Sequence, residues 1–419
     1  MTEETRRWIE KDKVHAWHPF TDQELWTADE HEPLVLVRGE GVFLWDSEGR
    51  RYLDGNSSIW TNIHGHSHPV LNRALAEQAV QVSHTSYLGF ANPRASELAE
   101  RLCGFFPKGA LDRVFFSDNG STAIEVALKM AVQYRMQTGE PERRRFVVFA
   151  NAYHGDTMGA ASVGGVSRFM ERFADYGFDT VVVSSVKMLK EISASEKATV
   201  AAVVIEPLVQ GVNEMHMWPE GMLAEVRQWC DDSGVQLILD EVMTGFGRTG
   251  TMFACQQEEV IPDFLCLAKG LTGGYLPLAA TLTTNEIYEA FHGSEHAFYY
   301  GHSYTGNQLA CAVALANLQV FEEERTLQHV AEISPVFQKV MEGLSGPQVK
   351  EVRVCGMIAG VELVSSEVRG ARGQEVCLKA RRHGLLTRPI LDTVVVMPPL
   401  CITEEEIVSL GQMLSKAIS

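Results

Sequence analysis

The stretch 262-PDFLCLAKGLTGGYLPLAA-280 is the most informative part of the chain. Its apolar run, Phe264–Ala268, has the length and composition of a strand buried in a sheet. The run ends on Lys269, and a turn rich in glycine follows. A lysine at a strand end usually points to water, but a turn that holds its amine partly desolvated makes the amine reactive. Lys269 is therefore the first candidate for a reactive group.

Composition limits the classes of protein that the chain can belong to. With 419 residues, 45% of them hydrophobic and 21% charged, it is typical of a globular protein with at least two lobes. The net charge of −18 argues against a nucleic-acid partner. The charged first residues predict no signal peptide, and no apolar stretch is long enough to predict a membrane span. Eight cysteines without a C-x-x-C pair favour a reducing compartment, and we expect the cytoplasm.

Three regions are expected along the chain. Residues 1–65 hold short strands, with a hairpin turn predicted at Gly39-Glu40-Gly41, and residues 311–419 are helical with two further strands, at Met357–Leu363 and Val394–Met397. These two regions are expected to form one smaller lobe. Residues 66–310 alternate helices and strands, which predicts a large α/β domain around a mainly parallel sheet. The predicted strands are Arg113–Phe116, Phe146–Ala150, Val200–Ile205, Val235–Leu239, Phe264–Ala268 and Leu278–Thr283.

Ligands of such sheets bind beyond the carboxyl ends of the strands, so functional residues are expected directly after the strands. After the first strand, Gly120 and Ser121 open an amphipathic helix, and a helix that starts on a glycine turn is suited to a phosphate. The same residues also fit an ordinary capped helix without a ligand. Tyr153 follows the next strand and could stack on a flat ring, or pack as an ordinary turn residue.

Asp240 ends another predicted strand, and residues 245–250 after it match the dinucleotide pattern G-x-G-x-x-G. A dinucleotide site is therefore one alternative, although the acidic residue precedes the glycines and the next strand ends on Lys269 rather than on an acid. His64, His66 and His68 suggest a second alternative, a metal site, but no neighbouring carboxylate or cysteine completes a set of ligands.

Together, a strand-end lysine, a strand-end aspartate, a phosphate-type helix start and an aromatic side chain suit pyridoxal 5'-phosphate. The segments LILDEVMTGFGRTG (237–250) and DFLCLAKGLTGGYLPLAA (263–280) then identify the resemblance. They resemble the class III, fold-type I aminotransferases, and the resemblance covers nearly the whole chain. It implies an α/β fold with a smaller α+β lobe, and a homodimer with shared active sites. WHPFT (17–21) and TRPILD (387–392) resemble the branch that aminates 8-amino-7-oxononanoate in biotin biosynthesis; ornithine, 4-aminobutyrate and other ω-amino acid transaminases stay as alternatives.

The resemblance also implies roles for individual residues. Lys269 holds the cofactor covalently and moves the proton, and Asp240 pairs with the ring nitrogen. The phosphate is bound by Gly120 and Ser121, with help from the partner subunit's His302 and Ser303. Tyr153 stacks on the ring, and Arg388 holds the carboxylate of the substrate. The other residues expected to contact substrate are Phe20, Ile59, Trp60 and Gly301.

The amino donor is less closely defined by the sequence. Members of this branch that use S-adenosylmethionine commonly carry a tyrosine where Phe20 stands, a tryptophan where Ile59 stands and a tyrosine where Val395 stands. Losing those groups removes stacking and hydrogen bonding that such a donor can use. The pattern also resembles a branch that uses lysine, so both donors stay open.

Overall fold

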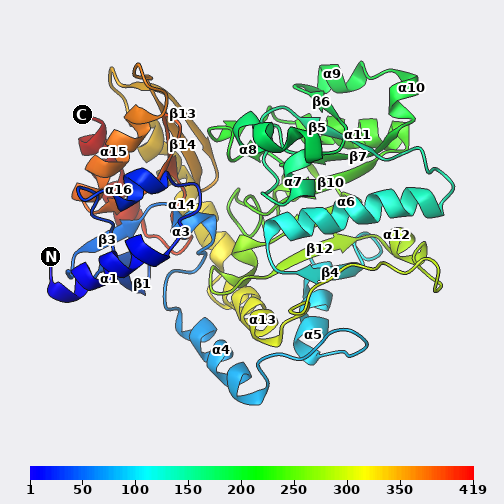
Figure 1. The fold of residues 1–419 in the computed structure, drawn as a ribbon, viewed down its shortest axis with the longest axis horizontal. Helices are drawn as coiled ribbons and strands as arrows, with labels where there is room; N and C mark the ends of the chain where they lie inside the picture. The colour runs from blue at the N-terminus through cyan, green and yellow to red at the C-terminus, as the bar shows by residue number, and fades with distance from the viewer.

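The computed structural model describes residues 1–419, with the side chains of Ser167 and Arg168 left out. The chain forms two bodies that lie side by side (Figure 1). One is built around a large sheet with helix α6 (Gly120–Gln137) across it, and the other holds both chain termini. The short helix α3 (Ser57–Trp60) lies between the two bodies.

The large sheet has seven strands in the order β4-β12-β11-β10-β7-β5-β6. Only β12 runs against its neighbours, so the sheet is mainly parallel, as the sequence predicts. The strands are β4 (Arg113–Ser117), β5 (Arg145–Phe149), β6 (Thr180–Val183), β7 (Val200–Ile205), β10 (Gln236–Asp240), β11 (Phe264–Leu267) and β12 (Ala279–Thr283).

Both faces of this sheet are buried, because side chains that alternate along each strand enter two different cores. On one face, Ile238, Phe264 and Cys266 pack against Ile124 and Leu128 of α6. On the other face, Leu237, Leu239 and Leu265 belong to the larger core. The helices of this body are α4 (Pro69–Gln81), α5 (Pro93–Cys103), α7 (Met158–Ser162), α8 (Ser167–Met170), α9 (Val186–Lys190), α10 (Ala194–Lys197), α11 (Met222–Ser233), α12 (Asn285–Glu289) and α13 (Gln308–Glu323), with 3₁₀ turns η1 (Glu171–Tyr176), η2 (Ala254–Glu258) and η3 (Lys269–Thr272).

The second body joins the start of the chain to its end. Strand β3 (Arg51–Asp54) pairs in parallel with β15 (Leu385–Leu386), and a separate sheet has the order β13-β14-β17-β16. Its other strands are β1 (Leu36–Glu40), β2 (Phe43–Asp46), β13 (Val349–Cys355), β14 (Ile358–Leu363), β16 (Pro389–Ile390) and β17 (Thr393–Val396), and a small ribbon pairs β8 (Val209–Gln210) with β9 (His216–Met217). Its helices are α1 (Glu3–His15), α2 (Gln23–Thr27), α14 (Thr326–Glu342), α15 (Ala371–Arg382) and α16 (Glu404–Ile418). The division of the chain at residues 65 and 310 stays a prediction.

Some predicted details differ from the structure. The hairpin turn lies one step later than Gly39-Glu40-Gly41, because Gly39 still pairs with Leu44 inside the β1–β2 ladder and the strands close at Glu40 and Phe43. Strand β6 was not predicted. It is a four-residue strand at the edge of the sheet, paired with β5 on one side only, and its Val182 side chain is exposed. Within the described residues, we find no helix that is long and apolar enough to cross a membrane.

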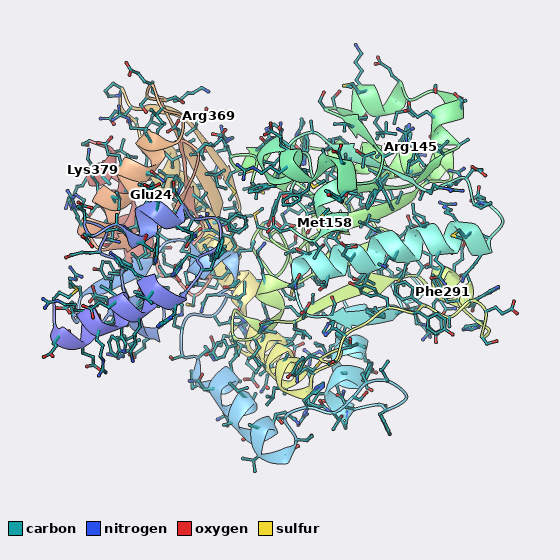
Figure 2. The ribbon with its side chains drawn as sticks, in the orientation of Figure 1. Glu24, Arg145, Met158, Phe291, Arg369 and Lys379 are labelled. Carbon is teal, nitrogen blue, oxygen red and sulfur yellow. The ribbon has the colours of Figure 1, made fainter. Side chains whose placement is uncertain are left out.

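Two labelled side chains show which end of the large sheet faces the second body (Figure 2). Arg145, at the start of β5, lies toward the far side of the molecule, whereas Met158, which begins α7 after that strand, lies toward its middle. The carboxyl ends of the parallel strands therefore point at the second body, and the residues that follow them are collected between the two.

The strand that leads to Lys269 depends on its burial, which a pair of matched substitutions tests. Leu265→Ala opens a cavity in β11, where the side chain is fully buried, and we expect a loss of about 2–5 kcal/mol of unfolding free energy. Leu378→Ala makes the same chemical change at a side chain of α15 that is 54% exposed, and we expect a change within about 0.5 kcal/mol. Urea denaturation followed by circular dichroism measures both; equal losses would contradict the buried position of β11.

Candidate active site

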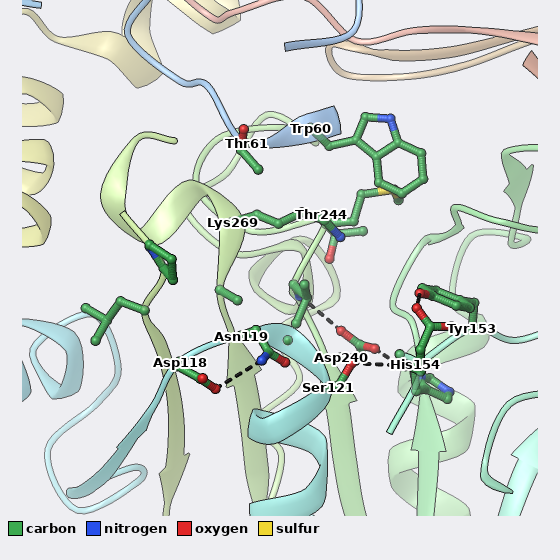
Figure 3. Close-up of a pocket in the computed structure, with 18 of the residues that line it drawn as sticks. Trp60, Thr61, Asp118, Asn119, Ser121, Tyr153, His154, Asp240, Thr244 and Lys269 are labelled. Atoms are coloured by element: carbon green, nitrogen blue, oxygen red, sulfur yellow. Dashed lines mark hydrogen bonds and ion pairs between the residues drawn. The ribbon is translucent and has the colours of Figure 1, made fainter. Parts of the chain in front are cut away.

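A cavity of about 750 Å³ opens at the carboxyl ends of the parallel strands (Figure 3). Residues from the ends of β4, β5, β7, β10 and β11 line it, and Trp60 of α3 closes it from the other body. Of the residues singled out in the sequence, six line this cavity: Trp60, Gly120, Ser121, Tyr153, Asp240 and Lys269.

Lys269 enters the cavity from the turn that follows β11. Its backbone has a φ of 41°, a left-handed conformation that is strained for a residue with a side chain. The Lys269 Nζ lies 5.0 Å from the centre of the Trp60 ring. Burial lowers the pKa of the Lys269 amine, although the negative charges of Asp240 and Glu206 act in the opposite direction. A larger neutral fraction makes this amine a better nucleophile and base than a lysine in water.

Asp240 lies at the end of β10 with 6% of its surface exposed. Its Oδ1 accepts a hydrogen bond from the Val242 N–H at 3.1 Å, and its Oδ2 lies 2.7 Å from the Nδ1 of His154. Burial opposes a charge on His154, but the hydrogen bond and the charge of Asp240 outweigh it and raise the pKa of the imidazole. The hydrogen bond to His154 therefore orients this carboxylate.

Glu206 is a second buried carboxylate in the cavity, and it follows β7 directly. Its Oε1 accepts a hydrogen bond from the Tyr153 N–H, and its Oε2 accepts one from the Gly211 N–H, both at 3.0 Å. Burial raises the pKa of Glu206 to about 7, against the lowering effects of His154 and of these backbone donors.

The start of α6 forms another wall of the cavity. Asn119 caps the helix by accepting the Thr122 N–H at 3.1 Å, so part of this helix start is an ordinary cap. Among the described residues, the N–H groups of Gly120 and Ser121 have no hydrogen-bond partner and remain available to an anion. A Cβ on Gly120 would lie 2.7 Å from Val242 Cγ1, so a larger residue would disturb this wall.

Trp60 is presented by an unusual turn of backbone. Four successive residues, Ser57–Trp60, have φ between 45° and 68°, a left-handed run that costs free energy in L-residues. Side chains hold the turn in place: Asp54 accepts hydrogen bonds from the Ser58 N–H at 3.0 Å and from the Ser58 Oγ at 2.8 Å, and the Trp60 Nε1 donates to the Asn56 Oδ1 at 2.9 Å. The indole is therefore fixed over the Lys269 amine.

Tyr153 lines the cavity after strand β5. Its hydroxyl donates to Asp156 Oδ2 at 2.6 Å, and its ring lies 5.4 Å from that of Phe169. Asp156 in turn donates its N–H to Ser121 Oγ at 3.1 Å. These contacts connect the aromatic side of the cavity to the start of α6.

The other predicted site residues do not line this cavity within a single chain. Phe20 is 65% exposed and contacts Phe169 with ring centres 5.8 Å apart, and Ile59 is 44% exposed. Gly301, Ser303 and Arg388 are exposed, while His302 Nε2 lies 3.9 Å from Asp118 Oδ1 at the rim. The roles expected for all six stay predictions.

Two buried ionisable residues of the cavity were not assigned from the sequence, namely Glu206 and the partner of Asp240, His154. The position of Glu206 directly after a predicted strand is the signal that could have identified it. His154 was noticed beside Tyr153, but its contact with Asp240 joins residues 86 positions apart and depends on the order of strands in the sheet.

Neither of the two alternative motifs forms the site that its sequence pattern suggests. Residues 245–250 form tight turns rather than a helix start, and a Cβ on Gly247 would lie 2.8 Å from Leu400 Cδ1, so little space for a dinucleotide is left there. The three histidines face separate partners: His64 contacts the Asn317 carbonyl, His66 contacts Asp54, and His68 contacts Glu324. Among the described residues, no group of three or more metal-binding side chains comes together.

Comparison with known proteins agrees with this arrangement. The family model "Aminotransferase class-III" matches residues 26–418. The adenosylmethionine-8-amino-7-oxononanoate aminotransferase of Geobacter sulfurreducens is 46% identical, over 100% of this chain and 98% of that protein. The protein of the same name from Aquifex aeolicus is 43% identical, over 94% of this chain and 93% of that protein.

Solved structures lead to the same family. The crystal structure of adenosylmethionine-8-amino-7-oxononanoate aminotransferase from Methanocaldococcus jannaschii superposes with a TM-score of 0.93, at 39% identity and over 99% of this chain and 98% of that one. An (S)-enantioselective ω-transaminase from Thermomicrobium roseum has the same TM-score at 34% identity, over 100% of this chain and 98% of that one. With its mainly parallel sheet, its strand-end lysine and this full-length similarity, the chain belongs to the class III aminotransferases, enzymes that transfer amino groups and depend on pyridoxal phosphate.

Proposed function

We propose that the protein transfers an amino group to 8-amino-7-oxononanoate, the reaction that gives 7,8-diaminononanoate in biotin biosynthesis. The observation that carries the proposal is the cavity that collects Lys269, Asp240 and the start of α6 at one sheet edge. The names of the full-length relatives add the acceptor, and favour this reaction over that of other ω-amino acid transaminases. The proposed site of action is the cytoplasm, which suits the free cysteines of the described chain.

The residues of the cavity fit pyridoxal phosphate. The amine of Lys269, the buried carboxylate of Asp240 and the free N–H groups of Gly120 and Ser121 are the three kinds of group that its aldehyde, ring nitrogen and phosphate require. The Tyr153 side chain would cover the ring. When bound, the cofactor supplies an aldehyde that forms a covalent bond with an amine and a ring that withdraws electrons.

The side chains then divide the work of transfer between them. With the cofactor bound, the Lys269 Nζ would take the proton from the donor carbon and pass it on, and burial, which lowers the pKa of this amine, favours the neutral form that accepts a proton. Asp240, oriented by His154, would pair with the ring nitrogen and favour its protonated form. Trp60 covers the amine and keeps water away from it. Arg388, Phe20, Ile59 and Gly301 are proposed to contact the substrates from the rim of the site.

Removing the amine tests the assignment of Lys269. Lys269→Ala should lower turnover of 8-amino-7-oxononanoate by more than about 10³-fold, because both the covalent link and the general base are lost. The yellow absorbance of the protein with cofactor should disappear as well. Lys129→Ala, on α6, is a control that removes a lysine outside the cavity. Turnover by Lys269→Ala at the rate of the unchanged protein would refute the assignment.

We infer two candidate amino donors, S-adenosylmethionine and lysine. The names of the relatives favour S-adenosylmethionine. Three positions favour lysine as the donor. Phe20 and Ile59 are exposed, and Val395 is fully buried in the cluster that also holds Trp60. None of these three side chains offers the hydroxyl or the second indole expected for a sulfonium donor.

A donor panel decides between the two. The purified enzyme is incubated with 8-amino-7-oxononanoate and either donor, and 7,8-diaminononanoate is quantified by mass spectrometry. We expect product with S-adenosylmethionine, following the relatives. Product with lysine alone would reject S-adenosylmethionine as the donor and favour the second candidate, and product with neither would contradict the proposed reaction.

We further propose that the protein acts as a homodimer in which the partner subunit's His302 and Ser303 reach the phosphate. The segment around these residues is held against residues 83–92: His84 donates to the Ser303 carbonyl at 2.7 Å and Asn92 to the Gly306 carbonyl at 3.0 Å. Large apolar side chains are exposed on these two segments, namely Leu88, Phe90, Tyr299 and Tyr304. Exposed apolar groups of this size commonly mark a surface that another chain covers.

Light scattering after gel filtration tests the dimer. At micromolar concentration we expect twice the mass of one chain, and Phe90→Glu should shift the protein toward the monomer by placing a charge in the covered surface. Val14→Glu, at a side chain that is 72% exposed on α1, is the control and should leave the mass unchanged. A mass of one chain for the unchanged protein would contradict the proposal.

A further inference from the structure

Glu206 stands beside the reacting groups because of the order of strands in the sheet. Strand β7 lies next to β10 with Ile205 opposite Leu239, so the residues that follow, Glu206 and Asp240, are neighbours at the same edge. Adjacent strands are about 4.8 Å apart, and the two carboxylates therefore enter the cavity side by side. The mechanism uses Asp240 but leaves Glu206 without a task.

The contacts of Glu206 leave part of its binding capacity unused. Each of its oxygens accepts one backbone N–H, from Tyr153 and from Gly211, and a carboxylate oxygen can accept a further hydrogen bond. Among the described residues, no lysine, arginine or histidine forms an ion pair with it, since His154 is committed to Asp240 at 2.7 Å. A buried, ionised carboxylate without an ion-pair partner costs free energy, and a cation that pairs with it removes part of that cost.

A cation does arrive with the proposed acceptor. In 8-amino-7-oxononanoate, the carbon next to the reacting ketone carries an amino group, which is protonated at neutral pH. The reacting carbon has to come within reach of the Lys269 Nζ, and Glu206 lies near enough to that amine to oppose the lowering of its pKa. An ammonium group on the adjacent carbon would therefore lie in the part of the cavity that Glu206 lines.

We propose that Glu206 binds the ammonium group on the carbon adjacent to the reacting carbon, and so selects substrates with two neighbouring nitrogen positions. The inference rests on the proposed function and names a binding residue for it. The pKa of Glu206, which burial raises to about 7, is consistent with it, because an ammonium group beside the carboxylate would favour the ionised form that burial opposes.

The experiment compares two acceptors that differ only in this amino group, 8-amino-7-oxononanoate and 7-oxononanoate, with the holoenzyme and its Glu206→Gln variant. We expect Glu206→Gln to lower kcat/KM for the aminated acceptor by about 30-fold or more, because a charge pair is lost in a buried site. The kcat/KM for 7-oxononanoate should change by less than about threefold, since that acceptor makes no such pair.

The control variant is Glu258→Gln. Glu258 also accepts two backbone N–H groups, from Gly221 at 3.0 Å and Ala224 at 2.9 Å, but it lies outside the cavity. Its replacement should leave the ratio of the two kcat/KM values unchanged. A drop of equal size for both acceptors in Glu206→Gln, or no drop for either, would overturn the inference.

A second arm separates this inference from the proposed reaction. The absorbance change of the holoenzyme is followed with 1,2-diaminopropane and with 2-aminobutane, a vicinal diamine and a matched monoamine. The unchanged protein should react faster with the diamine, and Glu206→Gln should lose this preference. If neither oxononanoate is an acceptor while the diamine preference holds and depends on Glu206, the proposed function fails and the binding role of Glu206 stands; without that preference the inference fails.

Discussion

The site depends on one physical constraint, the burial of the Lys269 amine at the end of a strand. An amine in such a place loses its hydration, and its charged form becomes less favourable. Here the burial lowers the pKa of Lys269 while two neighbouring carboxylates, Asp240 and Glu206, limit the effect. Burial thus favours the neutral amine, the form that a covalent bond and a proton transfer require.

The parallel sheet itself brings these groups together. In a parallel sheet all carboxyl ends meet at one edge, so β4, β5, β7, β10 and β11 each deliver a polar residue to the same cavity. The second body closes this edge with Trp60, on a strained left-handed turn that Asp54 and Asn56 hold. Strain of this kind persists only where the surrounding contacts over-determine it, and here those contacts fix the indole above the reactive amine.

Much of this arrangement could be predicted from local patterns. Lys269 and Asp240 were found because each follows a short apolar run with the length and composition of a buried strand, and Gly120 was found because a glycine turn opens an amphipathic helix. Contacts between distant segments could not be predicted, and the His154–Asp240 bond is the main example. Strand β6 was missed because an exposed edge strand of four residues lacks the pattern of a buried strand. The roles proposed for Phe20, Arg388 and the partner subunit's His302 rest on the resemblance to the family and not on local patterns of the sequence.

Reductive trapping tests the central claim most directly. The holoenzyme is treated with borohydride, which makes the link between cofactor and protein permanent, and the digested protein is mapped by mass spectrometry. The account predicts one modified peptide that contains Lys269, with the added mass of the reduced cofactor on that side chain. An adduct on another lysine, or none at all, would contradict the buried amine as the centre of this site.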